Sequence, residues 1–333
     1  MANKGKGRLH GRVAVVAGAT RGAGRGIARA LGEQGATVYC TGRSVKGKPS
    51  AYGRPETIEE TAELVTAAGG RGIALRVDHT EEAEVRALFA RVAKDEGRLD
   101  LLVNDLFSHQ MDWKPFYEAD LDQGFALMRQ AVFSHVITAR HAAPAMIARR
   151  RGLIVEIGDG DTLCYRGAFF YDLVKSTVIR LAFAMSEDLR RHRVAAVAVT
   201  PGFLRSEAML DQFGVTEDTW RKGVRKDRHF VASETPLYVG RAVAALAADP
   251  LVFAQTGESL SSWELARRYG FTDEDGSRPD WGRHFAREVP ERHFGQQWMR
   301  RGIAWQERLL KRARAYVPSG PSAAAPRAAS PRP

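Results

Sequence analysis

Short apolar runs alternate with helical stretches along most of the 333-residue chain. This alternation is typical of a parallel β-sheet that is covered by helices on both faces. We predict strands at Val13–Ala17, Thr37–Thr41, Ile73–Val77, Leu99–Asn104, Leu153–Ile157, Val194–Thr200 and Gly257–Ser262. Helices are predicted at Gly22–Gln34, Thr57–Ala68, Glu82–Glu96, Phe169–Arg191 and Thr235–Ala248. The chain is therefore expected to form an α/β fold with a doubly wound, seven-stranded parallel sheet.

The segments beyond the last predicted strand differ in composition from the main domain, which we place at residues 8–262. Trp263 to Arg292 is rich in charged residues, glycine, proline and aromatics, and we expect irregular structure that wraps the main domain. Gln297 to Val317 carries apolar residues at helical spacing among many arginines, which predicts a basic amphipathic helix within a 263–317 extension. Residues 318–333 are nearly all Pro, Ala, Ser, Gly and Arg, and we expect disorder there.

The net charge of +11 is compatible with nucleic acid, an anionic membrane or a phosphorylated ligand as a partner. The sequence holds no nucleic-acid-binding motif, so we expect no nucleic-acid partner. The basic helix at 298–317 could lie on a membrane surface. We favour the alternative, in which its apolar stripe packs onto the chain's own domain.

The sequence also bears on the cellular compartment. No run approaches the roughly 18 apolar residues that a membrane span requires. Val13–Ala17 is the only apolar run near the amino terminus, and it is shorter than the about 7 to 15 residues of a signal peptide's apolar region. Cys40 and Cys164 lie far apart and suggest no disulfide framework. We therefore expect cytoplasmic residence.

A glycine-rich turn, Gly18-Ala19-Thr20-Arg21-Gly22-Ala23-Gly24, follows the first predicted strand and leads into a helix. Glycines let the backbone turn tightly and approach a pyrophosphate, whose charge is stabilised by amide groups and by the helix amino terminus. Three glycines alone are weak evidence for a dinucleotide site. Such a site also requires a strand before the glycines and a helix after them, and both are predicted here. We predict a Rossmann-type fold in which Gly18, Thr20, Arg21, Gly22 and Gly24 bind the cofactor.

The second predicted strand ends at Thr41-Gly42-Arg43-Ser44, without the acidic residue that would hydrogen-bond a ribose 2′-hydroxyl. Arg43 and Arg21 offer two guanidinium groups instead, and their fork geometry matches phosphate oxygens. The sequence therefore favours NADP(H) over NAD(H) as the cofactor. The alternative is a pair of solvated arginines.

Tyr171 and Lys175 stand four residues apart in a predicted helix, so their side chains share one face. An ammonium close to a phenol favours the ionised phenol, whose unperturbed pKa is about 10. A tyrosine assisted in this way can act as a general acid or base near neutral pH. The spacing alone is weak evidence, because tyrosine and lysine are common.

From Leu9 to Ser262, the order and spacing of these motifs resemble those of the short-chain dehydrogenase/reductase family. Further matches are Asp78 after the third strand, Asn104 after the fourth, and Pro201, Gly202 and Ser206 after the sixth. The resemblance implies that Tyr171 exchanges a proton with the substrate oxygen and that Lys175 lowers its pKa and holds the nicotinamide ribose. It also implies that Asp78 contacts adenine, that Asn104 and Tyr171 are cofactor-binding residues, and that Pro201, Gly202 and Ser206 contact nicotinamide. By the same resemblance, the protein is expected to be a homodimer or homotetramer.

The stretch Leu265–Gly270, followed by Asp273–Gly276, resembles a branch of that family typified by dehydrogenase/reductase member one. This resemblance implies the reduction of carbonyl compounds with NADPH.

Three positions depart from the family pattern. Asn104 is followed by Asp105-Leu106-Phe107, where the family has a second asparagine and two small residues. The family's catalytic asparagine of the middle helix falls on Ala131, which cannot hold a water molecule as an amide does. The family serine, 12 or 13 residues before the tyrosine, falls on Asp159 or Gly158.

Asp159 is therefore a candidate catalytic residue with several open roles. An ionised carboxylate only accepts hydrogen bonds, so it cannot donate one to the substrate oxygen as serine does. Its charge would also raise the pKa of Tyr171 and oppose Lys175. Asp159 could remain protonated and donate, bind a substrate hydroxyl or amine while ionised, or point away and leave Thr162 or a backbone amide to hold the substrate. Asp161 adds a second carboxylate nearby.

Other candidates have simpler explanations. His109 lies in a polar segment after the fourth strand, where a solvated side chain is the simpler reading than a second acid or base. Nothing adjacent to Cys164 lowers its pKa, which predicts an inert thiol. No cluster has metal-ligand spacing, so no metal is expected.

The sequence favours an NADP(H)-dependent oxidoreductase that interconverts a carbonyl and an alcohol, with Tyr171, Lys175 and Asp159 as its catalytic residues. A small-molecule carbonyl or alcohol is the expected substrate. One alternative is an NADP-binding regulator or scaffold with little or no turnover. A second is imine reduction, in which an ionised carboxylate would stabilise a cationic substrate.

Overall fold

The computed structural model describes residues 7–48, 50, 53–107, 113–160 and 165–288. The strands form one parallel sheet in the order β3-β2-β1-β4-β5-β6-β7. Their bounds are β1 Val13–Ala17, β2 Thr37–Gly42, β3 Arg71–Arg76, β4 Leu101–Asn104, β5 Gly152–Ile157, β6 Val194–Thr200 and β7 Ser259–Ser261. This sheet confirms the predicted doubly wound, Rossmann-type α/β fold.

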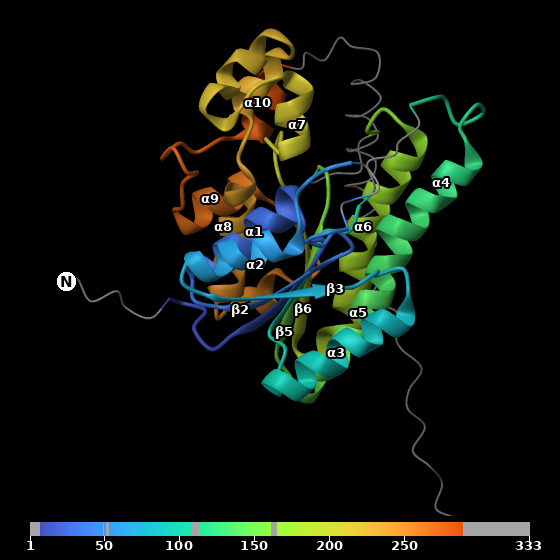
Figure 1. Cartoon of the computed structure of the whole chain (residues 1–333), viewed down its shortest axis with the longest axis vertical. Helices are drawn as coiled ribbons and strands as arrows, with labels where there is room; N and C mark the ends of the chain where they lie inside the picture. Colours follow the sequence, from blue (N-terminus) through green and yellow to red (C-terminus); the bar gives the residue numbers. More distant parts are fainter. Residues whose placement is uncertain (1–6, 49, 51–52, 108–112, 161–164, 289–333) are drawn as a thin grey trace, which may run out of the picture. The chain divides into compact units, whose positions relative to one another are not determined.

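Helices cover both faces of the sheet (Figure 1). The α-helices are α1 Gly22–Glu33, α2 Ile58–Ala67, α3 Glu82–Glu96, α4 Leu121–Met128, α5 Ser134–Ala148, α6 Phe169–Leu189, α7 Glu207–Phe213, α8 Pro236–Ala248, α9 Ser262–Tyr269 and α10 Trp281–Glu288. Shorter helical segments are η1 Arg129–Phe133, η2 Arg190–His192, η3 Glu217–Arg225, η4 Arg228–Ala232 and η5 Val252–Gln255. Helices α1, α2, α8 and α9 lie on one side, and α3, α5 and α6 lie on the other.

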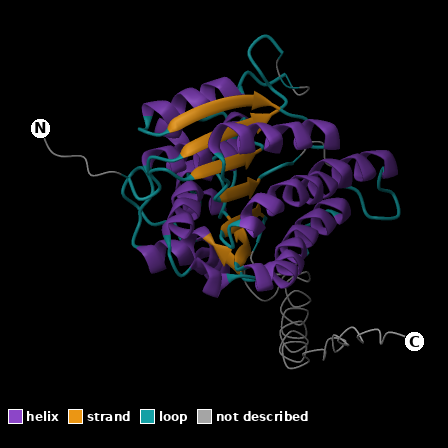
Figure 2. Cartoon of the chain, turned by 90° about the horizontal axis from the view of Figure 1, so that it is seen from below, coloured by secondary structure: helices purple, strands orange, loops and turns teal. Residues whose placement is uncertain are grey.

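The sheet is buried on both faces, which explains the continuous apolar runs in the sequence. Val16 belongs to a core cluster shared with α1 and α8, whereas its neighbour Val15 belongs to a cluster shared with α3 and α5. Successive side chains of a strand point to opposite faces, so each strand supplies both clusters. Figure 2 shows the strands between two helical layers.

Several predicted strand ends differ from the structure by one or two residues, and the third strand covers Arg71–Arg76 rather than Ile73–Val77. The fourth strand begins at Leu101 rather than Leu99, and the last strand covers Ser259–Ser261 rather than Gly257–Ser262. The last strand ends early because the Ser261 hydroxyl accepts a hydrogen bond from the backbone amide of Glu264, at 3.4 Å. This contact caps α9, which starts at Ser262.

The prediction of irregular structure from Trp263 onward is wrong for α9 and α10, whereas residues 270–280 between them form neither helix nor strand. Trp263, Leu265 and Ala266 of α9 are all buried, and Leu265 belongs to the same core cluster as α1 and α8. Glu264 lies between these apolar positions, and Arg267 and Arg268 follow them in the last turn of the helix. The predicted basic helix and the 318–333 tail lie outside the described residues.

Within the described part of the chain, no helix is both long and apolar enough to cross a membrane.

Candidate active site

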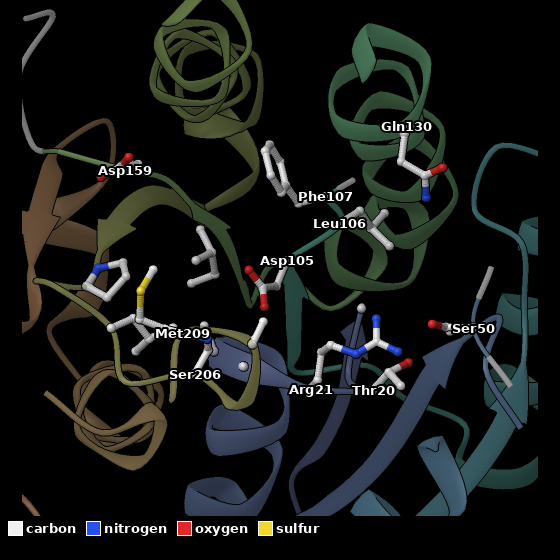
Figure 3. A pocket seen from close by; sticks show the side chains of 18 of the residues that line it. Thr20, Arg21, Ser50, Asp105, Leu106, Phe107, Gln130, Asp159, Ser206 and Met209 are labelled. Atoms are coloured by element: carbon white, nitrogen blue, oxygen red, sulfur yellow. The ribbon is translucent and has the colours of Figure 1, made fainter. Parts of the chain in front are cut away.

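A cavity of about 760 Å³ lies at the carboxyl edge of the sheet, where parallel α/β proteins bind their ligands. Figure 3 shows Asp159, Met209 and Ser206 toward one end, Thr20, Arg21 and Ser50 toward the other, and Asp105 between them. Most of the predicted site residues line this cavity: Gly18, Thr20, Arg21, Gly22, Arg43, Asp159, Tyr171, Lys175, Pro201, Gly202 and Ser206. Gly24, Asp78 and Asn104 are not among the lining residues.

The glycine turn joins β1 to α1 in a backbone shape that excludes larger residues. Gly18 has φ +90°, and a Cβ atom there would lie 2.2 Å from the backbone oxygen of Asp105. The backbone amides of this turn are held by carboxylates. The amide of Gly22 donates to Glu207 Oε2 at 2.8 Å, and the amide of Gly24 donates to Asp105 Oδ2 at 2.6 Å. The amino terminus of α1 thus binds negative groups, as helix amino termini do.

Neither carboxylate was identified from the sequence as a partner of the turn. Asp105 was noted only as a departure from the family pattern, and Glu207 lies 185 residues from Gly22. Burial raises the pKa of Asp105 to about 6, although Lys175 and the Gly24 amide act in the opposite direction. Asp105 therefore remains mostly ionised at neutral pH and places negative charge beside the turn.

The two predicted phosphate-reading arginines both line the cavity. Arg21 Nε donates to Glu56 Oε2 at 3.1 Å, while its buried Nη2 atom has no hydrogen-bond partner. Arg43 Nη1 lies 3.8 Å from Asp78 Oδ2 and its side chain is 41% exposed. An unpaired buried guanidinium nitrogen leaves a donor available for an anion.

Asn104 and Asp78 lie outside the cavity lining. The Asn104 amide nitrogen donates to Glu156 Oε1 at 2.7 Å, and Glu156 Oε2 lies 2.5 Å from His135 Nδ1. Asn104, Glu156 and His135 are all buried, so they form a polar network beneath the site. Asp78 accepts hydrogen bonds from the Thr80 amide and hydroxyl. Burial raises the pKa of Asp78, but these hydrogen bonds together with the charge of Arg43 outweigh it and hold that pKa below its usual value.

Tyr171, Lys175 and Asp159 come together at one end of the cavity. The Tyr171 hydroxyl donates a hydrogen bond to the Asp159 carboxylate. Lys175 Nζ lies 4.4 Å from the ring centre of Phe107, whose ring packs edge-on against Tyr171 at 5.7 Å. The structure thus places the predicted carboxylate, not a serine hydroxyl, against the tyrosine.

Burial and the charge of Asp159 together raise the pKa of Tyr171 well above its usual value. This direction confirms the expectation that a carboxylate at position 159 opposes ionisation of the phenol. Burial lowers the pKa of Lys175, although Asp159 and Asp105 act to raise it. Tyr171 is therefore protonated at neutral pH.

Arg166 contacts the residues of this site, although no sequence motif identified it. Its guanidinium Nε donates to the backbone oxygen of Asp159. Its Nη1 atom donates to Asp172 Oδ1 at 3.1 Å and to Ser176 Oγ at 3.2 Å. Arg166 thus ties the segment after β5 to helix α6, which carries the tyrosine.

Gln130 is a second site residue that was not predicted from the sequence. Ala131, where the family asparagine was expected, packs in an apolar cluster with Leu127 and Val174. The preceding residue, Gln130, lines the cavity, and Figure 3 shows its amide. Both residues lie in η1, a π-helical turn between α4 and α5, and such turns are frequent at functional sites.

His109, Asp161, Thr162 and Cys164 lie outside the described residues. Among the residues that are described, no group of histidine, cysteine, aspartate and glutamate side chains could hold a metal ion.

A parallel sheet with a glycine turn beside a cavity at its carboxyl edge defines a nucleotide-binding protein of the Rossmann class. The family model described as short chain dehydrogenase matches residues 12–214. The chain belongs to the short-chain dehydrogenase/reductase family, whose members are oxidoreductases.

Individual relatives are similar over most of the chain. The mouse (Mus musculus) protein Dehydrogenase/reductase SDR family member 1 is 34% identical over 276 residues, which cover 80% of this chain and 85% of that protein. The 7alpha-hydroxysteroid dehydrogenase of Clostridium sardiniense is 30% identical over 206 residues, covering 61% of this chain and 75% of that protein. A metagenomic short-chain oxidoreductase solved in complex with NADP aligns with a TM-score of 0.58 at 27% identity, covering 76% of this chain and 96% of that one.

Proposed function

We propose that the protein is an NADP(H)-dependent oxidoreductase that interconverts a carbonyl and an alcohol, with carbonyl reduction as the favoured direction. One observation carries the proposal: a single cavity joins the glycine turn and Arg21 to the Tyr171 hydroxyl and Lys175. The glycine turn and Arg21 can bind a dinucleotide, and the Tyr171 hydroxyl with Lys175 can transfer a proton. The similar metagenomic short-chain oxidoreductase was solved in complex with NADP, which supports this choice of cofactor.

The residues present fit a phosphorylated dinucleotide. The glycine turn lines the cavity at the amino terminus of α1, and Arg21 has an unpaired donor in the cavity wall. We assign the pyrophosphate to the turn at Gly18 to Gly24 and the 2′-phosphate to Arg21 and Arg43. Pro201, Gly202 and Ser206 are assigned to the nicotinamide.

When bound, NADPH would supply a hydride to the substrate carbon. Tyr171 then donates its proton to the substrate oxygen as the carbonyl π electrons move onto that oxygen. The raised pKa of Tyr171 keeps the phenol protonated at neutral pH, which is the form that reduction requires. Lys175 stabilises the phenolate that forms, and Asp159 holds the hydroxyl until the substrate oxygen replaces it as acceptor.

The function is tested by following NADPH absorbance with a panel of ketones, aldehydes and imines. The proposal expects oxidation of NADPH with at least one carbonyl compound. Binding of NADPH without oxidation by any compound would favour a nucleotide-binding scaffold instead.

Imine reduction is a second candidate, and the hydrogen bond between Tyr171 and Asp159 favours it. An ionised carboxylate beside the reacting atom stabilises a cationic iminium but repels a developing oxyanion. A cyclic imine and the matching cyclic ketone, assayed side by side, separate the two. A higher kcat/KM for the imine would assign the site to C=N reduction.

Replacement of Arg43 is expected to reduce selectivity for the phosphorylated cofactor. Arg43→Ala removes a charged donor to the 2′-phosphate, and such hydrogen bonds contribute about 1.5–3 kcal/mol, or roughly 10- to 150-fold in affinity. NADH has no such phosphate, so its affinity should change little. Calorimetric titration of both cofactors measures the ratio. Arg86→Ala, which removes an exposed arginine of α3 outside the cavity, is the control. An equal loss for NADPH and NADH would contradict the assignment.

Glu207→Gln is expected to tighten NADPH binding by about two- to tenfold. Glu207 holds the Gly22 amide and lies 3.9 Å from Arg25, so its charge competes with the pyrophosphate for the same groups. Glutamine keeps the shape of the side chain and removes that charge. The dissociation constant of NADPH is measured by fluorescence, with Glu187→Gln, an exposed carboxylate of α6, as control. Weaker or unchanged binding would show that Glu207 does not compete with the cofactor.

We propose a homo-oligomer located in the cytoplasm, as the family resemblance and the two distant cysteines suggest. Exposed apolar side chains on α4, η1, α5 and α6, which include Phe125, Phe133, Val136 and Leu173, offer a surface for association.

A further inference from the structure

Helix α10 contributes Trp281 to the cavity wall. This helix lies beyond residue 214, where the match to the family model ends. It also lies in the segment that the sequence predicted to be irregular. The segment that follows the last strand therefore contributes a side chain to the cavity wall.

Contacts with three other elements hold α10 in place. A Cβ atom on Gly282 would lie 2.6 Å from Trp263 Nε1 of α9, so the two helices touch closely. His229 Nδ1 of η4 lies 3.0 Å from His284 Nε2. The ring of Trp281 packs edge-on against Phe203, with the ring centres 5.6 Å apart.

Phe203 connects Trp281 to an aromatic cluster. The ring centre of Phe203 lies 5.2 Å from that of Phe230, which in turn lies 4.5 Å from Phe213 and 5.9 Å from Trp220. These residues come from α7, η3, η4 and the loop after β6. We call the four rings and Trp281 the aromatic cap. Figure 1 shows α7 and α10 beside each other at the same end of the molecule.

The extension also contacts the loop after β6, to which we assign the nicotinamide. A Cβ atom on Gly202 would lie 2.7 Å from Trp281 Cβ and 2.9 Å from Glu234 Oε2. The buried Glu234 carboxylate accepts hydrogen bonds from the Gly202 amide at 2.9 Å and from the Ser262 hydroxyl at 2.6 Å. Gly202 is thus confined between Trp281 and Glu234, and only glycine fits without a shift.

Five apolar residues of the loop after β6, α7 and α10 contribute to the cavity wall. Phe203, Leu204, Ala208 and Met209 line it together with Trp281. Figure 3 places Met209 toward the same end as Asp159, which bonds the Tyr171 hydroxyl. Apolar walls with a few placed polar groups are typical of sites that bind apolar small molecules.

We propose that Trp281 and Phe203, supported from behind by the rest of the aromatic cap, form the substrate-binding wall and select carbonyl compounds that carry an aromatic or bulky aliphatic group. This inference rests on the proposed function and extends it to the substrate class. Trp281 is a specificity-determining residue in this account, because its ring covers the apolar part of the substrate while Tyr171 meets the reacting oxygen.

The test compares an aryl ketone, acetophenone, with a small ketone, acetone. For Trp281→Ala, kcat/KM for acetophenone is expected to fall about tenfold or more, since lost apolar contacts in a pocket cost roughly 10- to 200-fold. The value for acetone should change less than about threefold, as should the dissociation constant of NADPH. Trp281→Phe should recover most of the loss. Phe285→Ala is the control, because Phe285 packs against Trp281 at 6.1 Å but does not line the cavity.

A binding experiment separates this inference from the proposed function. Calorimetry with benzamide and acetamide, which are not reduced, compares their affinities for the NADP-loaded protein whether or not any ketone turns over. The wild type should bind benzamide about tenfold tighter or more, and Trp281→Ala should abolish the difference. Should Trp281→Ala unfold, Trp281→Leu gives the same comparison with a smaller change. If Trp281→Ala weakened the binding of benzamide and acetamide equally, or weakened neither, the proposed role of Trp281 would be overturned.

Discussion

Tyr171→Phe is expected to lower kcat by about 10²- to 10⁴-fold, which is the usual contribution of a general acid. The variant loses only the hydroxyl that donates to Asp159, and the ring keeps its edge-on contact with Phe107. Since no cofactor group is assigned to that proton, the dissociation constant of NADPH should change less than about threefold. Rapid-mixing kinetics and a fluorescence titration measure the two quantities.

Thr177→Val is the matched control for Tyr171→Phe. It removes a hydroxyl from the same helix that bonds the backbone oxygen of Leu173, away from the cavity. Its turnover should equal that of the wild type. If Tyr171→Phe retained wild-type kcat, another group would have to supply the proton.

Asp159→Ala is expected to lose most turnover, by about 10²-fold, while NADPH binding changes little. The carboxylate is the hydrogen-bond acceptor of the Tyr171 hydroxyl, so its removal leaves the phenol without its partner. It also removes a charge that raises the pKa of Tyr171, and that pKa should fall toward its usual value. An ultraviolet titration of tyrosinate in the wild type and the variant measures this change.

Asp159→Ser restores the residue type of the family pattern and distinguishes two roles of the carboxylate. A serine hydroxyl can donate to a substrate oxygen, whereas an ionised aspartate cannot. If this site reduces ketones and Asp159 serves as a donor when protonated, Asp159→Ser should recover turnover that Asp159→Ala loses. If the site binds cationic imines, the serine variant should remain as impaired as the alanine variant. Unchanged kinetics in Asp159→Ala would exclude a direct role for this residue.

The sheet and the tyrosine–lysine pair could be predicted because their signals are local. Runs such as Val13–Ala17 are apolar throughout since both faces of the sheet are covered. Tyr171 and Lys175 share a helix face through their spacing of four. The glycine turn was recognisable because a strand precedes it and a helix follows.

The rest of the site depends on contacts between residues far apart in the sequence. Glu207 reaches Gly22, and Trp281 reaches Gly202, only after the chain has folded. Arg166 is one arginine among many until its contacts with Asp159 and Ser176 are known. Gln130 was missed because a π turn alters which side chain of that helix faces the cavity.

Asn104 makes contacts within the protein that its position in the family motif did not predict. Its motif position suggested a cofactor contact, and we retain that role as a proposal. In the structure its amide bonds Glu156, while its oxygen is buried without a partner. A ligand or water that reaches this oxygen would satisfy it.

The central claim is that hydride passes from the cofactor to a substrate held at Tyr171 and Asp159. The most direct measurement uses NADPH carrying deuterium at both C4 positions, together with the carbonyl compounds and imines of the panel, and mass spectrometry of the products. The account predicts that the wild-type product gains one deuterium and that Tyr171→Phe forms this product far more slowly. Binding of NADPH without deuterium in any product would contradict it.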